Sequence, residues 1–166
     1  FCVEFARHKA LVTFNIAGAQ RPNLLLCIAD DMSWAHTGID GDPAIKTPNI
    51  DKLARAGVRF QHAYCSAPSC TPSRAALLTG RAFCQLEEGS SLLSTLPKKF
   101  SVYPDLLEKA GYAVGFTGKG WDPGNWRPGG RTRNPVGPRY ASFHDFLEKV
   151  EAGKPFCFWL GSHDPH

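Results

Sequence analysis

Residues 70–81 read CTPSRAALLTGR, a pattern that predicts a short helix. Thr71 is a good N-cap residue, and Pro72 suits the first helical position. Gly80 is a residue type at which helices commonly end, because glycine adopts the left-handed conformation without steric cost. A helix bounded in this way begins directly after Cys70.

Cys70 is the residue of this segment that offers the most chemistry. Just ahead of a helix, unpaired N–H groups and the helix dipole favour an anion. Arg74 follows about one turn later, so the Cys70 thiol is expected to ionise more easily than that of a free cysteine. The alternative from this residue alone is a buried, structural cysteine beside a short helix.

The composition is that of a globular domain with a real core, at 166 residues, 43% hydrophobic and 20% charged. The formal net charge of +4 is compatible with acidic substrates and too small to indicate nucleic-acid binding. No apolar run is long enough to span a membrane. No two cysteines form a CxxC pair and none forms a CxxH pair, so a zinc module is not expected.

The first residues, 1–19, have features of a secretory signal. Arg7 and its basic neighbours precede a modestly apolar run at 10–16, and small residues at 17–19 offer a cleavage site before Gln20. We therefore expect a secreted or periplasmic protein. The apolar run is short and no initiating Met precedes it, so a weak first strand is the alternative.

Three continuous apolar runs predict strands that are buried on both faces. They occupy residues 24–29, 112–116 and 156–160. Helical patterns alternate with them, which predicts an α/β fold with a mainly parallel sheet and helices on both faces. Because parallel strands end at one edge of the sheet, the residues that follow these runs are expected to lie along a common rim.

Polar groups follow each of the three predicted strands. Asp30-Asp31 follows the first, Lys119 the second, and His163 with His166 the third. Two adjacent carboxylates would supply much of the oxygen shell of a calcium or magnesium ion. Taken alone, the two aspartates also fit loop solvation or helix capping, and Lys119 fits a solvated charge.

The segment 120–140 has a different composition, rich in glycine, proline and arginine. Its arginines, together with Trp121 and Trp126, would suit a sulfated sugar, because guanidinium groups pair with anionic oxygens and indoles stack on sugar faces. A mobile surface loop is the alternative reading.

The pattern Cys-x-Pro-Ser-Arg followed by Leu-Thr-Gly-Arg resembles the signature of the type I, formylglycine-dependent sulfatases. These belong to the alkaline phosphatase-like superfamily, and the resemblance covers the N-terminal part of the catalytic domain, here residues 20–166. The last segments are most similar to the N-sulfoglucosamine sulfohydrolase-like branch. Further matches lie at 22–31, 47–54, 117–119 and 163–166.

The resemblance implies a modified residue and a metal. Cys70 would be oxidised after translation to formylglycine (3-oxoalanine), by a maturation enzyme that reads Pro72 and Arg74. Asp30 and Asp31 would bind Ca²⁺, and the hydrated aldehyde at position 70 would also touch the metal.

The resemblance also implies how a sulfate group is held. Arg74 would hold the hydrate, and Lys119 would contact the hydrate or the sulfate. His166 would contact the sulfate or act as an acid toward the leaving group, and His163 has a weaker claim to contact the substrate. The expected reaction is hydrolysis of a sulfate ester or N-sulfate in a sulfated small molecule or carbohydrate.

Two departures from the family pattern bear on this expectation. The family often has a histidine two or three residues after the lysine, where this chain has Trp121 and Asp122. The family's second metal-binding segment and a later lysine would lie beyond His166, so the catalytic domain is expected to be incomplete, truncated after the His-x-Pro-His strand. Alternatives are a phosphonate or phosphate monoester hydrolase of the same superfamily, and an inactive fragment or binding module.

Overall fold

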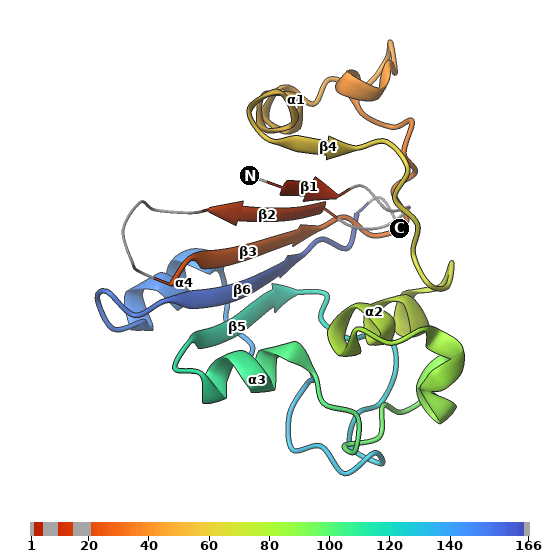
Figure 1. Ribbon diagram of the computed structural model, residues 1–166, viewed down its shortest axis with the longest axis vertical. Helices are drawn as coiled ribbons and strands as arrows, with labels where there is room; N and C mark the ends of the chain where they lie inside the picture. Colours follow the sequence, from red (N-terminus) through yellow and green to blue (C-terminus); the bar gives the residue numbers. More distant parts are fainter. Residues whose placement is uncertain (1, 5–9, 15–20, 165–166) are drawn as a thin grey trace.

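The computed structural model describes residues 2–4, 10–14 and 21–164, and side chains from residue 21 onward (Figure 1). The strands are β1 (Cys2–Glu4), β2 (Ala10–Phe14), β3 (Asn23–Ile28), β4 (Val58–Phe60), β5 (Ala113–Gly118) and β6 (Phe156–Gly161). The helices are α1 (Pro48–Ala56), α2 (Cys70–Thr79), α3 (Tyr103–Lys109) and α4 (Phe143–Lys149). Short 3₁₀ turns cover Gly38–Asp40, Phe83–Gln85 and Glu87–Ser90.

The main sheet has the order β2-β3-β6-β5, visible as the stack of arrows in Figure 1. Strands β3, β6 and β5 are parallel, and β2 is antiparallel to β3 at one edge. In the centre, Trp159 of β6 lies opposite Leu26 of β3 and Phe116 of β5. The predicted mainly parallel α/β sheet is therefore confirmed.

Alternation along β6 assigns one face of the sheet to α4. Phe156 and Phe158 meet the rings of Phe143 and Phe146, with the closest pair of ring centroids, Phe146 and Phe158, 4.6 Å apart. A Cβ on Gly115 of β5 would lie 2.9 Å from the Phe146 ring, so the glycine allows the helix to approach.

The intervening residues of β6, Cys157 and Trp159, belong to the main hydrophobic cluster on the opposite face. This cluster contains Leu78 of α2, and Leu107 of α3 packs against it. Helices therefore cover both faces of the sheet, as the alternating sequence pattern predicts.

Helix α2 begins two residues earlier than predicted. Ser69, not Thr71, is the N-cap residue, and the Ser69 carbonyl accepts the first helical hydrogen bond from Ser73 N at 3.0 Å. Cys70 is therefore the first residue of the helix rather than the residue before it. The predicted end at Gly80 is confirmed, with φ of 66° and its N–H bonded to the Ala76 carbonyl.

Part of the segment 120–140 contributes to the interior of the protein. Trp121 is fully buried. Arg131 is also buried and donates to the carbonyls of Leu96, Pro97 and Phe100. These contacts rule out the predicted sugar-stacking role for Trp121 and the anion-binding role for Arg131, because the groups already have internal partners.

Two other arginines of this segment also have partners within the protein. Arg133 forms ion pairs with Asp105 and Glu108 of α3. Arg127 lies over the ring of Trp126, with 4.4 Å from its guanidinium carbon to the ring centroid. Arg133 thus attaches the loop to α3, and Arg131 attaches it to residues 96–100, which precede α3.

The N-terminal prediction is only partly covered by the described residues. Residues 10–14 form β2, which pairs with β3, whereas residues 15–20, including the expected cleavage site, lie outside them. The secretory signal stays a prediction. Within the described ranges, no helix has the length and apolar character needed to cross a bilayer.

Candidate functional site

The rim predicted from the sequence forms where β3 and β6 leave the sheet. Ser162 N donates to the Ile28 carbonyl at 2.8 Å, and Asp30 N donates to the Asp164 carbonyl at 3.0 Å. These bonds keep the two chains side by side beyond the last sheet residues. Asp30 therefore turns inward and is 1% exposed.

Asp31 continues the chain in a different conformation. Its φ of 56° lies in the left-handed region, which aspartate tolerates better than most residues. The side chain is exposed, in contrast to its buried neighbour. The turn therefore brings two consecutive carboxylates close together, with that of Asp30 buried and that of Asp31 exposed to solvent.

Lys119 is placed by a close approach between the ends of β5 and β6. Gly118 has φ of 70°, and a Cβ on it would lie 2.0 Å from the Gly161 carbonyl oxygen. Lys119 N donates to that same carbonyl at 2.9 Å. No side chain larger than hydrogen fits at this crossing, so glycine is required on steric and conformational grounds.

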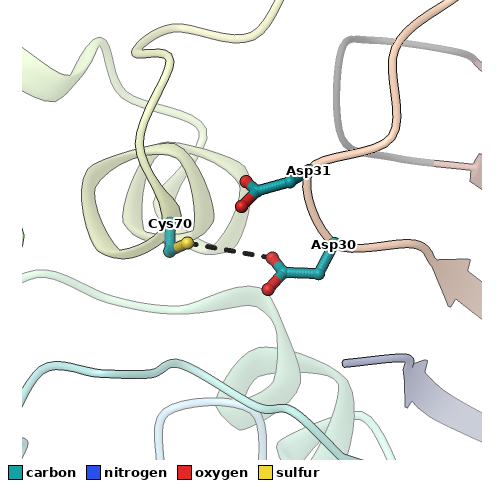
Figure 2. Close-up of side chains that lie close together, drawn as sticks. All are labelled: Asp30, Asp31 and Cys70. Carbon is teal, nitrogen blue, oxygen red and sulfur yellow. Dashed lines mark hydrogen bonds between the residues drawn. The ribbon is translucent and has the colours of Figure 1, made fainter. Parts of the chain in front are cut away.

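Cys70, at the first turn of α2, points toward Asp30 (Figure 2). Its Sγ lies 3.8 Å from Asp30 Oδ1, and Lys119 Nζ donates to it at 3.4 Å. Lys119 Nζ also forms an ion pair with Asp30 Oδ2. Residues 40 and 49 positions apart in the chain therefore meet at one sulfur atom.

Arg74 is buried beneath this cluster, with 2% of its surface exposed. One guanidinium nitrogen donates to the carbonyls of Lys119 and Gly120, at 3.0 and 2.7 Å. The other lies 3.2 Å from Asp30 Oδ1. Asp30 thus stands between two cations, and each of its oxygens accepts from one of them.

Three residues of this arrangement form a group of possible metal ligands. Ligand atoms of Asp30, Asp31 and Cys70 all lie within 4.8 Å of one another. The two carboxylates suit a hard cation such as Ca²⁺. A thiol is a soft ligand and suits it poorly, whereas an oxygen-bearing derivative at position 70 would complete a set of oxygen donors. The residues present therefore fit calcium better after modification of Cys70 than before it.

The structure brings together five of the residues predicted for the site: Asp30, Asp31, Cys70, Arg74 and Lys119. His163 is described and exposed, and no contact to this cluster is seen for it. His166 lies outside the described residues. Its predicted role stays a prediction.

Two tryptophans near the cluster make contacts that the sequence did not predict. Trp159 donates its indole N–H to the Lys119 carbonyl at 3.0 Å, and Trp121 donates to the Thr71 carbonyl at 3.2 Å. The sequence shows only that Trp159 lies in an apolar strand and that Trp121 follows Lys119. Neither pattern indicates which carbonyl an indole will reach.

A protein-family model described as Sulfatase matches residues 22–134, which is more than half of the chain. The chain belongs to the sulfatase family. The matched range includes every one of the five clustered residues and ends before β6.

Individual sulfatases are similar to the same region. N-acetylgalactosamine-6-sulfatase of Homo sapiens is 38% identical over 120 residues, covering 64% of this chain and 22% of that protein. Arylsulfatase A of Homo sapiens is 36% identical over 138 residues, covering 80% of this chain and 26% of the relative. The chain therefore spans about a quarter of the length of these curated relatives.

The fold is also similar to that in the crystal structure of Ps i-CgsB. The TM-score is 0.70 at 26% identity, over 89% of this chain and 46% of the other. None of these relatives bears the name N-sulfoglucosamine sulfohydrolase, and membership of that branch stays a prediction.

Proposed function

We propose that this chain is the nucleophile-bearing part of a sulfuric ester hydrolase. The observation that carries the proposal is the meeting of Cys70, Asp30 and Lys119 at the carboxyl edge of the sheet, in a member of the sulfatase family. Asp30 and Asp31 would hold Ca²⁺, and residue 70 would act as formylglycine.

Formylglycine and Ca²⁺ would each make a defined chemical contribution. Hydrated formylglycine would supply a hydroxyl nucleophile that can later release sulfate by restoring the aldehyde, and Ca²⁺ would supply positive charge beside it.

Lys119 and Arg74 have different tasks in this proposal. Lys119 Nζ lies 3.4 Å from the atom at position 70 that would be replaced, so it can stabilise negative charge there or on a sulfuryl oxygen. Arg74 donates to Asp30 and to two carbonyls, so it holds Asp30 and the Lys119 peptide in place. We assign to Arg74 the positioning of the site in addition to the expected contact with the hydrate.

The substrate proposed is a sulfated small molecule or a sulfated carbohydrate, in an O-sulfate or N-sulfate linkage. Relatives named for N-acetylgalactosamine-6-sulfate and for aryl sulfates both resemble this chain. His163 and His166, which follow β6, are proposed to contact the substrate, with His166 as the candidate acid toward the leaving group.

Peptide mass spectrometry across residue 70 tests the modification. Protein produced together with a formylglycine-generating enzyme in a secretory compartment should carry the aldehyde, whereas an intact thiol under those conditions would contradict the proposal. Turnover of 4-nitrophenyl sulfate against 4-nitrophenyl phosphate then tests the reaction. A preference for phosphate would favour the phosphonate or phosphate hydrolase alternative.

Calcium provides a test that needs no turnover. Added Ca²⁺ should raise the unfolding temperature of the modified protein, because a ligand that binds only the folded state stabilises it. Asp31→Asn should remove most of this shift. An inactive fragment or binding module predicts an unmodified Cys70 and no calcium-dependent stabilisation.

A further inference from the structure

We propose that Trp159 is a positioning residue for Lys119, through a hydrogen bond that fixes the main chain from which the Lys119 side chain departs. Trp159 lies on β6 and is 1% exposed. Its indole N–H donates to the Lys119 carbonyl at 3.0 Å. The inference rests on the proposed function only in taking Lys119 as a working residue of the site.

Both polar atoms of the Lys119 main chain are engaged. Its N–H donates to the Gly161 carbonyl at 2.9 Å, and its carbonyl accepts from Trp159 and from Arg74, each at 3.0 Å. A carbonyl oxygen has two lone pairs, so these two donors saturate it. The peptide therefore has one well-defined orientation relative to β6.

The crossing with Gly161 removes the space for adjustment. A Cβ on Gly161 would lie 1.9 Å from the Lys119 carbonyl oxygen. The oxygen is therefore confined between the β6 main chain and two N–H donors. Movement of the Lys119 peptide would have to break at least one of these contacts, and the indole is the donor that reaches it from within the sheet.

The position of the peptide determines where the ammonium group lies. Lys119 Nζ reaches both Asp30 and Cys70 Sγ from this fixed origin. Arg74, the second cation on Asp30, lies over the Trp159 ring, with 5.7 Å between its guanidinium carbon and the ring centroid. The Trp159 indole therefore contacts both residues that carry the cations. Its N–H bonds to the Lys119 carbonyl, and its ring face lies against the Arg74 guanidinium.

Phe158 offers a matched control on the same strand. It is fully buried and packs against Phe143 and Phe146 on the opposite face of the sheet. Phe158→Leu therefore weakens the core next to Trp159 without touching the Lys119 carbonyl. A purely structural role for Trp159 predicts the same behaviour in both variants.

The experiment compares Trp159→Phe with Phe158→Leu and with the unaltered full chain. Brief acylation with acetic anhydride, followed by peptide mass spectrometry, reports how well the Lys119 amine is protected, and the exposed Lys99 serves as internal reference. Trp159→Phe should raise Lys119 labelling relative to Lys99 by roughly tenfold, the factor expected for one buried hydrogen bond. Unchanged labelling, or an equal rise in Phe158→Leu, overturns the proposal.

A second variant removes the donor and keeps the ring. Incorporation of 3-benzothienylalanine at position 159 replaces the indole N–H by sulfur, so packing and the Arg74 contact are retained even if Trp159→Phe folds poorly. Lys119 labelling should rise here too, and protection at the original level overturns the proposal. In modified protein, kcat for 4-nitrophenyl sulfate should fall by about 10- to 100-fold with little change in KM. Because labelling needs no turnover, loss of the sulfatase proposal would leave this test intact.

Discussion

Asp30 is the residue on which the charges of the site converge. Its carboxylate is almost fully buried and accepts from Arg74 on one oxygen and from Lys119 on the other. Burying a charge is costly unless it is paired and hydrogen-bonded, and here each cation depends on the same carboxylate. Asp30 therefore has a structural task that is separate from any metal.

Asp30→Asn should destabilise the protein by about 3 kcal/mol, because two buried cations lose their counter-charge. Urea unfolding without added calcium measures the effect. Asp31→Asn is the matched control, since it removes the neighbouring charge at an exposed position whose left-handed φ asparagine also tolerates, and it should cost less than about 1 kcal/mol. Equal losses in the two variants would contradict the task assigned to Asp30.

The candidate site was predictable where the sequence carries a motif. Asp30, Asp31 and Lys119 follow predicted strands, so their meeting on one rim was expected from the rule that parallel strands end together. Cys70 and Arg74 lie on a helix, and their place beside that rim was implied only by the resemblance of their signature to that of the sulfatases. The carbonyls that accept hydrogen bonds from Arg74 were not predictable, because main-chain oxygens carry no sequence signal. His163 and His166 stay predictions.

At the scale of elements, the ends of β5 and β6 cross more closely than any other main-chain contact of the glycines that the structure describes. Gly118 combines a positive φ with a neighbouring carbonyl oxygen that would overlap any Cβ. The two requirements have different energetic origins, backbone conformation in one case and direct overlap in the other.

Gly80 separates these two effects experimentally. Its φ is 66°, close to the 70° of Gly118, but nothing lies within 4 Å of its would-be Cβ. Gly80→Ala should therefore cost only the conformational penalty, roughly 1–2 kcal/mol. Gly118→Ala should cost at least about 2 kcal/mol more, measured by thermal unfolding, because the β5 and β6 main chains must separate. Similar losses would show that the junction can relax.

The elements themselves were largely predictable, and the exceptions have physical causes. The apolar runs predicted β3, β5 and β6 to within two residues at either end. The start of α2 was misplaced because Ser69 and Thr71 are both acceptable N-cap residues, and only tertiary packing chooses between them. Strand β4 ends at Phe60, where its pairing with the short β1 also ends.

At the scale of the whole molecule, the core thiols link stability to pH. Burial raises the pKa of the Cys157 thiol from 9.0 to about 12, and it also raises the pKa of Cys27. The folded state thus disfavours the thiolate at position 157. Below pH 9 both states hold the proton and stability is complete. As the pH rises from 9 toward 12, the unfolded state releases its proton first, so stability falls.

The unfolding free energy should therefore drop by about 2 kcal/mol more in the unaltered protein than in Cys157→Ala between about pH 8 and about pH 10.5. Guanidinium unfolding at the two pH values measures the difference. Cys84→Ala, at an exposed cysteine, should behave like the unaltered protein. An equal loss of unfolding free energy in Cys157→Ala and the unaltered protein would contradict the assignment of this pH dependence to Cys157.

The loop at 120–140 has a consequence for proteolysis. It contains four arginines, so trypsin would be expected to cleave it readily in an unfolded chain. In the folded protein Arg131 is buried and Arg133 is held by α3, while Arg127 precedes a proline, which blocks cleavage. Arg139 is bridged to β5. Limited trypsin digestion should leave this loop whole while cutting elsewhere, and early cleavage after Arg131 would show that its internal contacts are not kept. The loop should therefore resist trypsin although it has no regular secondary structure of its own.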